Sequence, residues 1–73
     1  MAKLPIVSGL QAVKAFSRLG WSIARQTGSH LIMERVGNEL VLSIPQRAEL
    51  KRGLLRQLIN DAGLTVDQFL DAL

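Results

Sequence analysis

The sequence contains no cysteine, which excludes two common ways of stabilising a small domain. Neither a disulfide nor a cysteine-ligated metal can hold the chain together, so stability must come from packing. With 73 residues there is room for one small domain, residues 1–73, and for no second core. The absence of cysteine also fits the cytoplasm, which is the location we expect.

Long apolar runs are missing as well. No stretch approaches the roughly 20 residues that span a bilayer, and residues 1–9 lack the apolar block of a signal peptide, so we expect no membrane segment. Hydrophobic residues make up 48% of the chain but aromatic residues only 4%, which predicts an aliphatic core. Such a composition leaves either apolar surface for a partner or scattered surface leucines.

Charge is unevenly distributed along the chain. Residues 1–56 carry all nine Lys and Arg and three Glu, whereas residues 57–73 carry only three Asp, and the net charge is +3. A basic body with an acidic end suits a polyanion such as nucleic acid, whose phosphates would be contacted by Lys and Arg.

The segment from Ser8 to Gly20 predicts an amphipathic helix. Ser8 and Gln11 have the spacing of a capping box, and Gly20 suits a C-terminal cap. The apolar positions that recur on one arc of this helix are Ala12, Val13, Ala15, Phe16 and Leu19.

Two further helices are expected near the C-terminus. Residues 52–62 form the longer one, which ends at Gly63. Thr65 and Gln68 form a second capping box at the start of a short last helix. The buried stripe predicted for the longer helix consists of Leu55, Leu58, Ile59 and Ala62.

Between the helices, residues 21–25, 31–36 and 39–44 have strand character. In the first run, Trp21, Ile23 and Arg25 alternate with small or polar residues and are expected to share one face. Pro45 stops the third run because proline cannot donate to a ladder. Turn residues separate the runs at Thr27-Gly28 and at Gly37-Asn38, so the three strands should form an antiparallel meander.

The predicted order is α-β-β-β-α with a short terminal helix, an α+β two-layer sandwich. Double-stranded-RNA-binding domains share this order, so the fold favours RNA. Fold alone does not assign a function.

The residue types exclude several enzyme classes. Without cysteine, with one histidine and with no acidic pair at ligand spacing, a zinc or two-metal site is not expected, and no cofactor is implied. Ser29 and His30 are neighbours in a predicted strand and should point to opposite faces, which disfavours a Ser–His nucleophile. No Gly-rich phosphate loop is present.

Metal-independent cleavage of RNA remains open, because RNA carries its own nucleophile, the 2′-hydroxyl. The imidazole of histidine, whose unperturbed pKa is about 6.5, transfers protons near neutral pH and typically contributes about 10²–10⁴-fold. Arg and Lys can hold the phosphate. Both faces of the His30 strand are mixed, so alternation leaves the direction of the imidazole undecided. A structural role for His30 stays open on these grounds alone.

Three segments read together resemble the HicA family of mRNA interferase toxins, which act with a HicB antitoxin. They are SGLQAVKAFSRLGW, RQTGSHLIM and IPQRAELKRGLLRQLINDAGLTVDQFL, and together they cover most of the chain. The resemblance implies a double-stranded-RNA-binding-like fold, metal-free endoribonuclease activity on mRNA and a catalytic histidine, which maps onto His30. Trp21 matches an aromatic position that we interpret as packing.

The resemblance also implies partners. We expect a HicB-type antitoxin that covers the active site, a toxin that is monomeric alone and a larger complex with the antitoxin. Many family members have a second histidine after the proline that ends the third strand, where this chain has Arg47. Because arginine does not exchange protons at neutral pH, we interpret Arg47 as a phosphate contact. The candidate RNA contacts are Arg25, Gly28, Ser29, Arg47, Lys51 and Arg52.

Two alternatives remain. The chain could be a non-catalytic RNA-binding module of the same fold, or a protein-interaction domain whose basic face docks an acidic partner.

Overall fold

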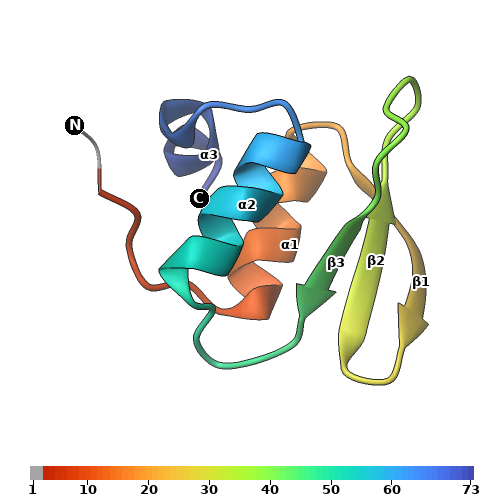
Figure 1. The fold of residues 1–73 in the computed structure, drawn as a ribbon, viewed down its shortest axis with the longest axis horizontal. Helices are drawn as coiled ribbons and strands as arrows, with labels where there is room; N and C mark the ends of the chain where they lie inside the picture. Colours follow the sequence, from red (N-terminus) through yellow and green to blue (C-terminus); the bar gives the residue numbers. More distant parts are fainter. Residues whose placement is uncertain (1–2) are drawn as a thin grey trace.

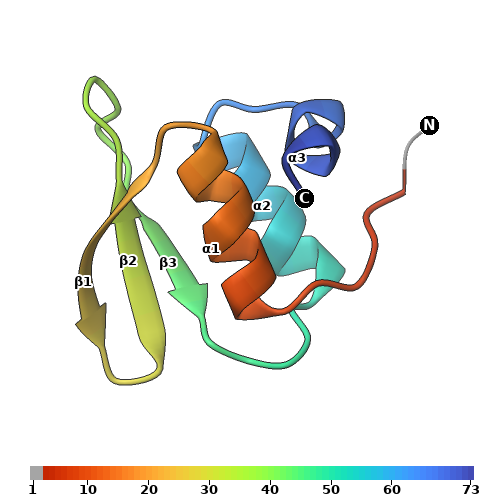
Figure 2. The same ribbon diagram turned by 180° about the vertical axis from the view of Figure 1, so that it is seen from behind.

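The computed structural model describes residues 3–73 and contains a three-stranded antiparallel sheet and three helices. The strands lie in the order β1-β2-β3. The helices lie together on one side of the sheet, and β1 is the strand furthest from them in both views (Figures 1 and 2). The predicted α+β order is therefore confirmed. The elements are α1 (Gly9–Arg18), β1 (Ser22–Thr27), β2 (His30–Glu34), β3 (Leu42–Pro45), α2 (Arg52–Asp61) and α3 (Val66–Ala72).

The core fills the space between the helices and the sheet. The two phenylalanines, Phe16 of α1 and Phe69 of α3, are fully buried with ring centroids 5.1 Å apart. Met33 contributes from β2, and Trp21, just before β1, is 2% exposed. The predicted stripe of α2 is also buried (Leu55, Leu58, Ile59 and Ala62).

Side-chain hydrogen bonds cap the N-termini of two helices as predicted. At α1 the Gln11 amide donates to Ser8 Oγ (3.0 Å) and the Ser8 amide donates to Gln11 Oε1 (2.8 Å). Thr65 and Gln68 form the same reciprocal pair at α3. Helix α2 differs, because its N-cap residue is Lys51 and no side chain caps it.

Long-range contacts attach α3 to the rest of the fold. Arg18 Nη1 donates a hydrogen bond of 2.6 Å to the carbonyl oxygen of Ala72. A cation at the last carbonyls of a helix also interacts favourably with the helix dipole. Arg18 therefore has a structural role. Within residues 3–73 no helix is long and apolar enough to cross a bilayer.

The strand boundaries differ from the predicted ones. The predicted third strand, 39–44, is wrong at both ends: β3 begins at Leu42 because Asn38 Oδ1 accepts from the Leu40 amide (3.0 Å) and holds the preceding segment in a loop. Pro45 is the last residue of β3 rather than the residue after it. This position is tolerated because β3 is an edge strand, where a missing N–H need not break a ladder.

The expected alternation in the first strand is also wrong. Ile23 pairs with Met33, but Arg25 pairs with Ile32, and the register shifts between these two positions. Such a bulge adds one residue to a strand, so the residues on either side of it change face. Ile23 and Arg25 therefore lie on opposite faces of β1.

Candidate functional site

His30 is the first residue of the central strand β2, at the end of the sheet where the β1–β2 hairpin turns. In the register of the sheet it lies opposite Thr27 of β1 and Pro45 of β3. Its side chain is half-buried. The predicted position at the start of the second strand is confirmed, whereas its chemical role stays a prediction.

The burial pattern decides which face of the sheet carries His30. Met33, Leu42 and Ile44 are fully buried, and Leu31 packs against the same core, so this face of the sheet meets the helices. Because successive strand residues point to opposite faces, His30 lies on the other side. We call this side the open face.

Strand pairing identifies the neighbours of His30 on the open face, since paired residues share a face. Arg25 pairs with Ile32, two residues along from the Thr27–His30 pair, and is exposed. Arg25 is thus a diagonal neighbour of His30, at a separation of roughly 7–8 Å in such sheets. The residues around His30 on the open face are Arg25, Thr27, Ile32, Ser43 and Pro45.

The turn before His30 consists of Gly28 and Ser29. Gly28 has φ +57° and Ser29 has a negative φ, a combination that matches a two-residue type II′ hairpin. A Cβ on Gly28 would meet nothing within 4 Å, so its backbone angle and not crowding is the reason for glycine. This backbone angle explains the glycine at position 28, whereas its contact with RNA stays a prediction.

The segment between β3 and α2 is held against this turn by backbone hydrogen bonds. The Gln46 amide donates to the Ser29 carbonyl (2.7 Å), and the Gly9 amide donates to the Arg47 carbonyl (2.9 Å). Arg47 follows Pro45, the partner of His30, by two residues. Its exposed side chain therefore starts from a backbone that is fixed relative to His30. Ser29 acts here through its carbonyl.

Gly9, at the start of α1, has a structural role that the sequence pattern does not predict. A Cβ on Gly9 would lie 2.2 Å from the Pro45 carbonyl oxygen and 3.0 Å from Gln46 Cα. Only a residue without a side chain lets α1 approach the end of β3 this closely. The sequence carries no signal for this contact, because the two segments are more than thirty residues apart.

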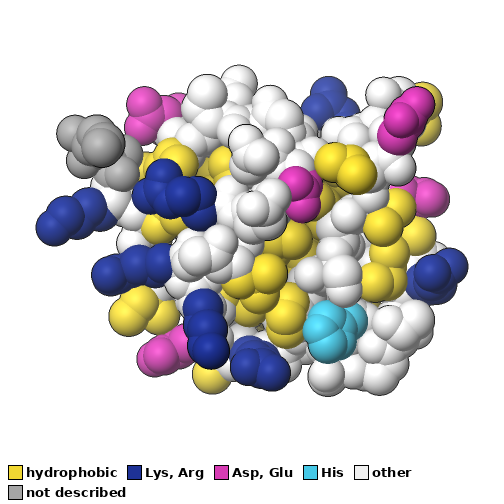
Figure 3. Space-filling view, viewed as in Figure 1, with side chains coloured by type: hydrophobic (Ala, Val, Ile, Leu, Met, Phe, Trp, Pro, Cys, Tyr) yellow, Lys and Arg dark blue, Asp and Glu magenta, His cyan; other side chains and the backbone are white. Residues whose placement is uncertain are grey.

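Basic side chains continue from His30 toward α2. The cations of the β3–α2 segment and of α2 are all exposed: Arg47, Lys51, Arg52 and Arg56. In Figure 3 dark-blue side chains form a row that begins near the cyan histidine and rises over the α2 side of the molecule. The first turn of α2 contains no acidic residue, so no carboxylate of that turn offsets the positive end of the helix dipole. We refer to these four cations as the basic row.

The predicted site residues thus fall into two groups. One group lies around the β1–β2 turn and consists of Arg25, Gly28, Ser29, His30 and Arg47. The other group lies at the start of α2 and consists of Lys51 and Arg52. Within residues 3–73 no three His, Asp or Glu side chains gather as metal ligands would.

Comparison with known protein families gives a match over most of the chain. The family model described as "HicA toxin of bacterial toxin-antitoxin" matches residues 10–64. The matched segment runs from α1 through the sheet to the end of α2 and includes both His30 and the basic row. No curated protein matches this chain.

Proposed function

Since this chain belongs to the HicA family of toxins of bacterial toxin–antitoxin systems, we propose that it is a metal-independent endoribonuclease that cleaves mRNA in the cytoplasm. The observation that carries the proposal is the placement of His30 on the open face, beside Arg25 and the segment that holds Arg47. Proton transfer and phosphate binding can then act on one RNA phosphate.

The reaction uses the substrate's own nucleophile. The imidazole of His30 takes the proton of a 2′-hydroxyl, and the 2′-oxygen forms a bond to the adjacent phosphorus. The bond from phosphorus to the 5′-oxygen breaks, and that oxygen receives a proton from water. The imidazolium of His30 then returns its proton to the hydroxide that remains. The products are a 2′,3′-cyclic phosphate and a 5′-hydroxyl.

The arginines supply charge rather than protons. The phosphorane carries more negative charge than the ground state, so a guanidinium placed beside it stabilises the transition state. Arg47 extends from a segment tied to the hairpin turn, and Arg25 approaches from the opposite strand. This assignment gives Arg47 the phosphate-binding part of the position at which many family members carry a second histidine.

RNA affinity is assigned to the remaining candidates. Lys51 and Arg52 extend the positive surface onto α2, where they would contact phosphates outside the scissile bond. Gly28 and Ser29 form the β1–β2 turn, next to which the RNA meets His30. Most of the affinity is then independent of the imidazole.

A toxin of this family has an antitoxin partner. We infer that a HicB-type antitoxin covers the open face and the basic row with acidic side chains, so that RNA cannot reach His30. Opposite charges would speed association. In this scheme the free toxin is monomeric and the antitoxin complex is larger.

The test is His30→Ala. Cleavage of a single-stranded RNA should fall by about 10²–10⁴-fold, the usual contribution of a general acid or base, while RNA affinity changes little. EDTA should leave the wild-type rate unchanged. Fluorescence of Trp21, the single tryptophan of the chain, verifies that the variant is folded.

Two results would contradict the proposal. Full cleavage by the variant would remove His30 from the chemistry, and a rate lost in EDTA and restored by a divalent ion would make the mechanism metal-dependent. RNA binding without any cleavage by the wild type would instead support a non-catalytic RNA-binding module.

A further inference from the structure

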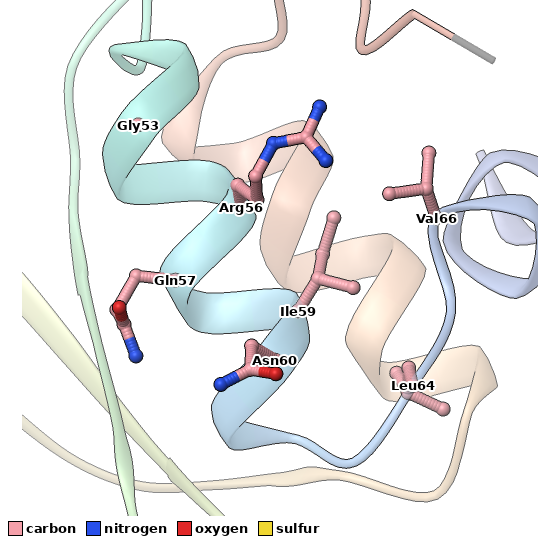
Figure 4. A pocket seen from close by; sticks show the side chains of 7 residues that line it. All are labelled: Gly53, Arg56, Gln57, Ile59, Asn60, Leu64 and Val66. Atoms are coloured by element: carbon pink, nitrogen blue, oxygen red, sulfur yellow. The ribbon is translucent and has the colours of Figure 1, made fainter. Parts of the chain in front are cut away.

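A hollow of about 430 Å³ lies between α2 and the segment that leads into α3. Figure 4 shows Ile59 of α2 and, across the gap, Leu64 and Val66. Ile59 is 2% exposed and the other two are half-buried, so they provide an apolar floor. Arg56 and Asn60 of α2 stand at its rim and are exposed.

The polar groups at the rim differ in what they are free to bind. Gln57 Nε2 donates to Asp61 Oδ1 (2.8 Å) and is already engaged within α2. The Arg56 side chain extends from α2 toward the side of the hollow on which Val66 lies (Figure 4). An apolar floor with a guanidinium and an amide at its rim suits a flat molecule with apolar faces and a hydrogen-bonding edge. A nucleobase has this chemistry.

The position of the hollow on the basic row connects it with RNA. Arg52 and Arg56 are four residues apart, so they lie on the same side of α2, about 6 Å apart along its axis. This separation is comparable to the length of one nucleotide, so a phosphate held at Arg52 would place a neighbouring base beside Arg56. A strand bound at His30 and Arg47 that follows these cations reaches the rim of the hollow.

Two other hollows fit a nucleotide less well. One includes Glu34 and Glu39, whose carboxylates repel phosphate. Another lies between the N-terminal segment and Leu73, and its amide side chain, Gln11, is engaged in the α1 capping box.

We propose that the hollow between α2 and α3 is a base-binding subsite for a nucleotide outside the scissile bond, and that Arg56 makes it favour guanine. Guanine presents two acceptors, O6 and N7, on one edge, and a guanidinium can donate to both. Asn60 would contact another polar group of the base, and the apolar floor would pack against its face. This inference rests on the proposed action on RNA, and it adds a determinant of sequence preference.

The test compares cleavage preferences. Single-stranded oligoribonucleotides with randomised sequence are digested by the wild type and by Arg56→Gln, Asn60→Ala and Arg35→Gln, and the cut sites are sequenced. The wild type should favour guanine at one fixed distance from the cut. Arg56→Gln and Asn60→Ala should reduce that preference about ten-fold, the order expected for one specific base contact. Arg35→Gln removes the same charge from the exposed end of the sheet and should keep the preference.

Binding provides a second measurement that needs no catalysis. A 2′-O-methyl oligonucleotide with one guanine and a guanine-free counterpart cannot be cleaved, and their affinities are measured for the same proteins. The wild type should bind the first more tightly, and Arg56→Gln should bind both equally.

The outcomes separate the subsite from the ribonuclease function. A cleavage or binding preference for guanine that persists in Arg56→Gln and Asn60→Ala, or a wild type without such a preference, would overturn the subsite. Selective binding by a wild type that cleaves no RNA would support the subsite and refute the proposed chemistry.

Discussion

Replacing Gly9 by alanine introduces a methyl group at a place that backbone atoms already occupy. The added Cβ would lie 2.2 Å from the Pro45 carbonyl oxygen, whereas real Cβ atoms essentially never approach another heavy atom within 3.0 Å. The neighbouring Gln46 Cα, at 3.0 Å, restricts the direction in which the strand end can move. Either α1 or the segment after β3 must therefore shift.

The expected loss of stability follows from two opposing effects. Overpacking at a close contact destabilises by about 1–3 kcal/mol. Alanine favours the helical conformation over glycine by at most about 1 kcal/mol, and by less in the first turn. The net effect of Gly9→Ala should be a decrease of about 1–2 kcal/mol in the free energy of unfolding. A shift would also strain the hydrogen bond from the Gly9 amide to the Arg47 carbonyl.

Gly53→Ala is the matched control, because Gly53 also lies in the first turn of a helix. A Cβ at Gly53 would meet nothing within 4 Å, so only the helix preference acts and the variant should be neutral or slightly stabilised. Urea unfolding followed by the fluorescence of buried Trp21 gives both free energies. In thermal unfolding the midpoints of the two variants should differ by on the order of 10 °C.

A Gly9→Ala protein as stable as Gly53→Ala would refute the close approach of α1 to the end of β3. Under the proposed function, Gly9→Ala should also reduce RNA cleavage at temperatures where it is fully folded, because Arg47 shifts relative to His30.

The remaining predictions concern the basic row and the antitoxin. Arg52→Gln should weaken RNA binding to a similar extent for all sequences and reduce the salt dependence of log K by about 0.7, the loss of one phosphate contact on a single strand. An unchanged salt dependence would remove Arg52 from the interface. His30→Ala should still bind the antitoxin tightly, since one imidazole is a small part of a large interface, and RNA should compete with the antitoxin in a titration. Simultaneous binding of both without loss of affinity would rule out inhibition by covering the open face.

The helices could be predicted from the sequence because their determinants are local. The capping pairs Ser8–Gln11 and Thr65–Gln68 span three residues each, and both form as expected. The buried side chains of α2 could be predicted from their apolar spacing for the same reason, since helical periodicity acts within a few turns. The position of His30 at the start of the second strand also followed from a local signal, the turn at Gly28.

The features that the sequence did not predict depend on contacts between residues that are far apart in the chain. Only the burial of Met33, Leu42 and Ile44 shows that His30 lies on the open face, because both faces of its strand are mixed in the sequence. The bulge between Ile23 and Arg25 places Arg25 on the same face of the sheet as His30. The alternation of residues in the sequence does not reveal such an insertion. The contact of Gly9 with Pro45 and the hollow beside Arg56 each join segments from different elements, and they exist only once packing brings those elements together.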